Sequence, residues 1–442
     1  MKFFNRDASQ SEYKNAVNII RQKSQPLEHL DALIEAAGDA RIVLLGEASH
    51  GTHEYYTVRT KITQRLIAEK GFHFIGVEGD WPDCYLLNRY IKAYQDENKK
   101  IAEVLEHFTR WPTWMWANWE VAALTEWLRE WNQPKPANEK AGFYGIDVYS
   151  LWESLEAVMN YLREVDPEAS KATQQAIRCF EPYRTDDGQS YAWATRQVVP
   201  ASCQTEVMQL LKKIRRGIPQ YDHDREAVFS TEQNALVAVN AEKYYRAMVQ
   251  FGASSWNVRD HHMTETIARL LDFHGPNSKA IIWEHNTHIG DARATDMADE
   301  GLVNVGQLVR EKYGGSQVFA VGFGSYQGSV IAARQWRAPM QDMEVPPARK
   351  ESWEALLQEA GNFDKIIFSK DIQEEPSMQQ PWAHRAIGVV YHPEKEKYGN
   401  YVPSIIPGRY DAFIFLPETE ALHPLGLPAD AEKIPEAYPW GV

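Results

Sequence analysis

Four apolar runs in this chain end abruptly in a carboxylate, and three histidines lie beside those ends. The residues are Glu47, Glu78, Asp147 and Glu284, with His50, His285 and His288. Carboxylates beside imidazoles move protons near neutral pH, because a carboxylate can orient an imidazole that acts as a general base. One such ending would carry little information, but four with three histidines predict an acid–base active site.

The strongest local signal is the segment GEASHGT, residues 46–52. Glu47 ends an apolar run and His50 lies in the turn that follows, so His50 is the predicted general base. Glu47 and Glu78 are candidates to orient it, because adjacent parallel strands would bring their ends close together. The alternative is a His50 that only caps the next helix or stabilises the turn.

A second polar segment, EHNTH, spans residues 284–288. His285 and His288 could position a substrate carbonyl, donate to a developing oxyanion or activate water. Glu284 and Asn286, in the same segment, are predicted substrate-binding residues. The alternative is a hydrogen-bonded strand terminus, although apolar strands seldom end in five polar residues.

Arg59 and Asp147 extend the predicted site. Arg59 lies in the helix expected after His50 and could pair with Glu47 or Glu78, or hold an anionic group. A lone helical arginine is as often a surface residue. Asp147 ends its strand as the two glutamates do and is expected to form the far wall of a cleft.

Two other segments supply candidate substrate-binding residues. Asn257 and Arg259 are expected to open a helix, where side chains and free N–H groups can face a ligand, although capping that helix is an equally good interpretation. Trp114 belongs to an aromatic run over 111–119 that could cover an apolar ring or a sugar. Such a cluster more often packs in a core.

These side chains need a sheet whose strand ends meet at one edge. Short runs of Val, Ile, Leu and Phe predict strands buried on both faces of a parallel sheet, which binds ligands at its carboxyl ends. Strands over 42–47 and 72–78, joined by a helix over roughly 53–70, predict a parallel, right-handed crossover unit. The expected fold class is α/β, with a largely parallel central sheet flanked by helices.

The order of elements predicts how the chain divides. Residues 1–150 and 276–442 are expected to form the α/β catalytic core, because strand patterns recur at 141–147, KAIIWEHN, QVFAVGFGS, KIIFS, RAIGVVY and YDAFIF. Residues 151–275 are almost purely helical in pattern. We therefore expect a large helical insertion over the carboxyl ends of the strands, forming a lid or cleft wall.

Net charge, cysteine spacing and apolar stretches limit which ligands and partners the sequence predicts. With 47 Lys and Arg against 61 Asp and Glu, the formal net charge is −14, which disfavours nucleic-acid binding. Cys84, Cys179 and Cys203 show no CxxC or zinc spacing, so neither a disulfide framework nor a thiolate metal site is indicated. No signal core follows Met1 and no apolar stretch reaches about 18 residues, so we expect a cytoplasmic protein with reduced thiols and no membrane partner.

Taken together, five motifs resemble the erythromycin esterase family: GEASHGTHEYYTVRTKI, FIGVEGDWPD, YGIDVYS, WNVRDHHM and WEHNTHIGDAR. The similarity extends from about residue 25 to about residue 415. It implies a metal-independent attack of water on a macrolide lactone, with His50 as general base and Glu47 and Glu78 around it. It also implies that three further residues belong to the active site, namely Arg59, His285 and His288.

The expected function is therefore hydrolysis of a carboxylic ester in a small-molecule pocket, with a macrolide lactone as substrate and no cofactor. A zinc-dependent hydrolase is the closest alternative, since His50, His285, His288 and a glutamate could bind the metal. Against it, His285 and His288 would point to opposite faces of an extended segment. A non-catalytic saccharide or small-molecule binding protein of polysaccharide biosynthesis is the other alternative. The sequence leaves the oligomeric state open.

Overall fold

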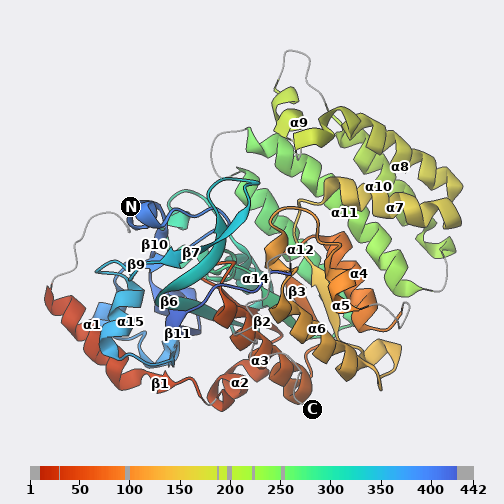
Figure 1. Cartoon of the computed structure of the whole chain (residues 1–442). Coiled ribbons are helices and arrows are strands. Elements are labelled where there is room, and N and C mark those ends of the chain that lie inside the picture. Colours follow the sequence, from red (N-terminus) through yellow and green to blue (C-terminus); the bar gives the residue numbers. More distant parts are fainter. Residues whose placement is uncertain are drawn as a thin grey trace. The chain divides into compact units, whose positions relative to one another are not determined.

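The computed structural model describes residues 10–28, 30–94, 100–186, 189–196, 202–221, 224–249 and 254–425 (Figure 1). The described residues group into two compact units. Unit 1 comprises residues up to Ile75, Arg89–Gly142 and everything from Ser278, and unit 2 comprises Gly76–Asn88 and Phe143–Asn277. The predicted division at residues 150 and 276 stays a prediction, and its outermost residues, 1–9 and 426–442, lie outside the described ones.

In the described part of the chain, the main sheet has nine strands in the order β1-β8-β11-β6-β2-β5-β3-β4, with β7 paired to β6. The strands are β1 (Gln25–Pro26), β2 (Ile42–Leu45), β3 (Phe74–Val77), β4 (Gly142–Gly145), β5 (Ala280–Trp283), β6 (Val318–Ala333), β7 (Met340–Val345), β8 (Lys365–Phe368) and β11 (Ala412–Thr419). A separate antiparallel pair is formed by β9 (Trp382–Arg385) and β10 (Tyr401–Ser404).

The centre of the sheet is parallel. β11, β6, β2 and β5 pair in parallel, whereas β1, β7 and β8 form antiparallel pairs at the periphery. Every residue of β2 and β5 is buried, which agrees with their Val, Ile and Leu content. The predicted α/β class with a largely parallel sheet is confirmed.

Two predictions about strands are wrong. β2 and β3 are not neighbours, because β5, which follows about 200 residues later in the chain, lies between them. Near RAIGVVY the strand β9 ends at Arg385, and Ile387 and Val390 make only isolated bridges. In both cases the pairing partner lies far away in the sequence, so the local pattern cannot specify it.

Unit 1 also contains ten α-helices in its described residues. They are α1 (Gln10–Lys23), α2 (Asp31–Gly38), α3 (His53–Lys70), α5 (Ile101–Leu105), α6 (Trp119–Asn132), α13 (Asn286–Ile289), α14 (Val305–Tyr313), α15 (Trp353–Ala360), α16 (Glu396–Gly399) and α17 (Ile406–Arg409). The helix predicted over roughly 53–70 is confirmed as α3, which ends where Gly71 adopts a positive φ of 70°.

Unit 2 is built mainly of helices. They are α7 (Leu151–Val165), α8 (Pro167–Phe180), α9 (Gln189–Ala194), α10 (Gln204–Gly217), α11 (Arg225–Met248) and α12 (Ser254–His274), while α4 (Trp81–Ile91) begins in this unit. Apolar residues at helical spacing, such as Leu155, Val158 and Leu162 on α7, form a shared core with Leu210 and Leu236. The helical character predicted for this region is confirmed.

A disulfide joins Cys179, at the end of α8, to Cys203, which precedes α10. The Cα atoms of the two residues lie 5.8 Å apart, although 24 residues separate them in sequence. The prediction of reduced thiols is therefore wrong for this pair, because packing of the helices, and not cysteine spacing, brings the residues together. Cys84 is a buried free thiol.

None of the helices in the described ranges has both the length and the apolar composition that a membrane span requires.

Packing of α11 against α12 buries a histidine. Asn240 donates from Nδ2 to Nδ1 of His262 at 2.9 Å, and His262 is 2% exposed. Burial lowers the pKa of His262 to about 4, although the charge of Asp147 acts in the opposite direction. The ring is therefore neutral at pH 7 in the folded protein.

We expect the free energy of unfolding to fall as the pH drops from about 6.5 to about 4, because the unfolded His262 binds a proton that the folded one resists. Between pH 7 and 5 the loss is about 2 kcal/mol. Urea denaturation of wild type and His262→Gln at several pH values measures this loss, as the difference between the two slopes of unfolding free energy against pH. The exposed neighbour His261 supplies the control, since His261→Gln should keep the wild-type slope. Equal slopes for wild type and His262→Gln would refute this account.

Candidate active site

The loop GEASHG and the segment EHNTH lie side by side in unit 1. They follow the parallel neighbours β2 and β5, in which Leu45 lies opposite Trp283. The backbone N–H of Asn286 donates to the carbonyl of Glu47 at 2.8 Å. A Cβ atom at Gly46 would lie 2.1 Å from Oδ1 of Asn286, so this close approach requires glycine.

A buried chain of polar contacts begins at His50. Nδ1 of His50 lies 2.9 Å from Oε1 of Glu47, and Oε2 of the same carboxylate accepts a hydrogen bond from Nη2 of Arg59 at 2.5 Å. His50 is 8% exposed, Glu47 1% and Arg59 0%. The carboxylate therefore holds the Nδ1–H of His50 on one side and the guanidinium on the other, which leaves Nε2 as the nitrogen that can accept a proton.

Aromatic rings and the backbone fix Arg59 in place. Its guanidinium carbon lies 4.6 Å from the ring centre of Tyr56 and 4.5 Å from that of Trp283, and Nε donates to the carbonyl of Tyr55 at 3.2 Å. Cation–π contacts of this kind stabilise a buried arginine where water cannot. Because Arg59 is fully buried behind Glu47, it acts on His50 through the carboxylate.

His285 has the opposite arrangement of nitrogens. It is the N-cap of α13, and its Nδ1 accepts a hydrogen bond from the backbone N–H of Thr287 at 3.3 Å and lies 2.8 Å from the Thr287 hydroxyl. The proton of the neutral ring is therefore assigned to Nε2. The ring centres of His50 and His285 are 4.9 Å apart.

Unit 1 thus places an imidazole that can take a proton beside an imidazole that can donate one. A general base and a hydrogen-bond donor at this spacing suit the addition of water to a carbonyl, because negative charge develops on the carbonyl oxygen as water loses its proton.

Unit 2 holds a second group of the predicted residues. Arg259 donates from Nε to Oδ1 of Asp147 at 2.9 Å, and from Nη2 to Oδ2 of Asp147 and Oε1 of Glu78, both at 2.6 Å. Burial alone would lower the pKa of Arg259, but the charges of Asp147 and Glu78 outweigh it and hold the pKa above its ordinary value. The ring of Tyr149 lies 4.8 Å from the guanidinium carbon.

Replacing Arg259 with Met is expected to destabilise the protein by about 3–5 kcal/mol, because buried Asp147 would lose both hydrogen bonds from the guanidinium. The side chain of Asp147 is only 4% exposed. Urea denaturation measures the loss. Arg184→Met, at an exposed ion pair with Glu156, is the control and should change stability by less than about 0.5 kcal/mol. Similar losses in the two variants would contradict the importance of burial.

The other predicted residues occupy varied positions. Asn286 exchanges two hydrogen bonds with the backbone of Phe323 in β6, at 2.6 and 3.2 Å, so its amide ties α13 to the sheet. Trp114 is 1% exposed and packs edge-to-face on Trp111. Three more predicted residues have known positions. Glu284, directly after β5, and His288, in α13, are buried, and Asn257, the fourth residue of α12, is half-buried.

Tyr56 and Thr287, which the sequence patterns did not indicate, hold predicted residues in place. Tyr56 donates from its hydroxyl to the carbonyls of His50, at 3.1 Å, and Met115, at 3.0 Å, and burial raises the pKa of the phenol, so it remains a donor. Thr287 sets the tautomer of His285. The position of Thr287 two residues after a histidine was a usable signal, whereas the contacts of Tyr56 depend on the fold.

The prediction that His285 and His288 lie in an extended segment is wrong. Residues 286–289 form the helical turn α13, so His285 and His288 are not in an extended segment and their side chains need not point to opposite faces. The spacing of the two histidines therefore does not distinguish the two mechanisms.

Comparison with known proteins agrees with the motifs. A family model described as erythromycin esterase matches residues 67–419. The chain is 22% identical over 366 residues to erythromycin esterase type II of Escherichia coli, covering 76% of this chain and 83% of that protein. It is also 22% identical over 438 residues to a Bacillus subtilis (strain 168) protein named "Putative hydrolase YbfO", covering 93% and 92%.

Solved structures share the fold. A protein from Bacillus cereus gives a TM-score of 0.76 at 17% identity, covering 93% of this chain and 99% of that one. A succinoglycan biosynthesis protein gives 0.71 at 18% identity, with coverages of 94% and 100%. A mutant of the erythromycin esterase EreC in its open conformation gives 0.66 at 15% identity, with coverages of 91% and 96%.

Proposed function

Because the chain belongs to the erythromycin esterase family, a family of hydrolases, we propose that it hydrolyses a carboxylic ester with water activated by His50. The observation that carries the proposal is the buried contact of Glu47 with Nδ1 of His50, beside the ring of His285. The family model begins at residue 67, so the roles of Glu47 and His50 rest on this geometry and on the motif around them.

In the proposed reaction, Nε2 of His50 takes a proton from water as the oxygen attacks the ester carbonyl. The imidazolium that forms is stabilised by Glu47, whose orientation Arg59 fixes through Oε2. Nε2–H of His285 donates to the oxyanion of the tetrahedral intermediate, and His288 assists in positioning the carbonyl. Collapse of the intermediate returns the proton from His50 to the leaving alkoxide.

The proposed mechanism needs no metal ion at His50, since the histidine and its carboxylate supply the base. The orienting role predicted for Glu78 and the binding roles predicted for Asp147 and Arg259, which unit 2 holds together, stay predictions. Activity that persists after treatment with a chelator would support the metal-free mechanism. A chelator-treated protein that stays folded by circular dichroism, yet regains activity only with added Zn²⁺, would refute it.

We propose a macrolide lactone as the substrate, supported by the similarity to an erythromycin esterase of Escherichia coli. The test is mass spectrometry of a panel of macrolides and simple esters after incubation with the purified protein. The expected product carries the mass of one added water. Failure to add water to any ester in the panel would contradict the proposal, and a product bearing phosphate, sugar or nucleotide would indicate a transferase.

A further inference from the structure

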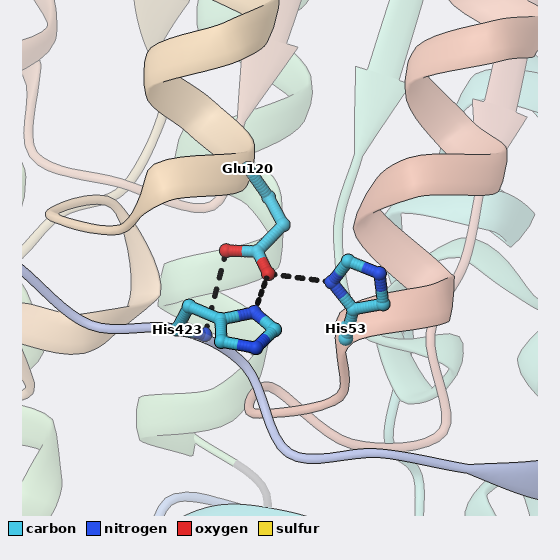
Figure 2. A group of neighbouring side chains, drawn as sticks. All are labelled: His53, Glu120 and His423. Atoms are coloured by element: carbon cyan, nitrogen blue, oxygen red, sulfur yellow. Dashed lines mark hydrogen bonds and ion pairs between the residues drawn. The ribbon is translucent and has the colours of Figure 1, made fainter. Parts of the chain in front are cut away.

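A second cluster of titratable side chains lies in unit 1, formed by His53, Glu120 and His423 (Figure 2). His53 is the first residue of α3, Glu120 the second residue of α6, and His423 follows β11. Oε1 of Glu120 lies 2.6 Å from Nδ1 of His53 and 2.6 Å from Nδ1 of His423. Three segments that are remote in sequence thus bring two imidazole nitrogens and a carboxylate oxygen together.

The buried carboxylate of Glu120 has two histidines as its ion-pair partners. Its side chain is 0% exposed, and its carboxylate contacts the two imidazoles and, at 3.4 Å, the backbone N–H of His423. In the candidate active site, by contrast, Glu47 pairs with Arg59. For Glu120, the described residues supply no arginine or lysine ion pair, so a proton on an imidazole or a bound cation must balance its charge.

We propose that His53, Glu120 and His423 form a binding site for a Zn²⁺ ion. Two imidazole nitrogens and one carboxylate oxygen are a common set of three protein ligands for zinc, with water in the fourth position. The side chains of His53 and His423 are 14% and 23% exposed, so a water molecule can reach the site. The ligand atoms already lie within 4.8 Å of one another.

Binding requires only a small rearrangement. Ligand atoms around a tetrahedral zinc ion are about 3.3 Å apart, so each N···O separation would lengthen by about 0.7 Å as the ion replaces the hydrogen-bonded protons. The second oxygen of Glu120 faces the backbone N–H of His423, and such an outer contact orients a ligating carboxylate.

The ion would fasten the segment that follows β11. This segment already makes backbone hydrogen bonds to the starts of α3 and α6. The N–H of His53 donates to the carbonyl of Glu420 at 2.9 Å, and the N–H of Trp119 donates to the carbonyl of His423 at 3.0 Å. Zinc would add a bridge between the start of α3, the start of α6 and His423. The inferred role is to bridge these three segments, and it does not depend on the proposed ester hydrolysis.

Titration calorimetry of the chelator-treated full chain with Zn²⁺ alone tests the inference. We expect one equivalent bound with a Kd of about 1 µM or below. His423→Gln and Glu120→Gln should each weaken binding at least about 100-fold, because even outer contacts of a zinc site contribute 10–100-fold. His392→Gln, at a partly exposed histidine that lies 3.5 Å from Glu394, is the matched control and should bind as wild type does.

Two results would overturn the site: a wild-type chain that takes up no zinc, and zinc binding that survives in both ligand variants. Circular dichroism checks that the variants fold. If they do not fold, Co²⁺ titration of the wild type decides, because tetrahedral coordination by nitrogen and oxygen gives an intense visible absorption band. A faint octahedral spectrum, such as free aqueous Co²⁺ gives, would overturn the proposed tetrahedral site.

Discussion

Replacing His50 with alanine is expected to lower kcat for ester hydrolysis by at least about 10²–10⁴-fold, since the loss of a positioned general base typically costs that much. The ring contributes through Nε2, while Nδ1 faces Glu47 at 2.9 Å. KM should change little, because the base acts mainly in the transition state. Steady-state kinetics with an ester that wild type cleaves measures both constants.

A surface histidine provides the control for this experiment. His392 does not take part in the polar contacts of Glu47 and His50, and its side chain is 39% exposed beside Glu394. His392→Ala should retain wild-type kcat. If His50→Ala lost less than about tenfold in kcat, another group would be the base and the assignment of His50 would be wrong.

Replacing Glu47 with glutamine is expected to damage both activity and stability. Activity should fall about 10²–10⁴-fold, because a carboxamide cannot hold the Nδ1–H tautomer of His50 or stabilise its cation. Stability should fall by about 3–5 kcal/mol, because the guanidinium of Arg59 is fully buried and would lose its anion. Kinetics and urea denaturation measure the two losses separately.

A double variant separates the two effects. In Glu47→Gln with Arg59→Met, the unpaired charge is gone and an apolar side chain of similar length fills the space between Tyr56 and Trp283. Most of the stability should return, because removing both members of a buried ion pair costs much less than removing one. Activity should stay low. A double variant no more stable than Glu47→Gln would show that the unpaired charge was not the cause.

Much of the fold follows from local patterns. β2 and β5 are four-residue apolar runs buried throughout, and helical spacing from Tyr55 to Ile67 predicts the observed α3. The polar ends of those strands also indicate where Glu47, His50 and His285 lie. The geometry that joins these residues depends on β5 pairing with β2, and β5 is more than 230 residues away in the chain.

Other features depend on contacts that no local pattern encodes. From the sequence, Arg59 could pair with Glu47 or with Glu78. In the folded chain Arg59 forms an ion pair with Glu47, whereas Glu78 pairs with Arg259. The disulfide of Cys179 arises where two helices of unit 2 converge. The sequence does not predict the cluster around Glu120, because its two histidines lie 370 residues apart, at positions with no metal-type spacing.

The proposed mechanism requires that His50 carries its proton on Nδ1 and that His285 carries its proton on Nε2. Long-range ¹H–¹⁵N correlation spectra of histidine-labelled protein at neutral pH report this directly, with His50→Gln and His285→Gln used to assign the two rings. We predict a protonated-nitrogen shift for Nδ1 of His50 and an unprotonated one for its Nε2, with the reverse for His285. A His50 that is protonated on Nε2 would contradict its role as the base.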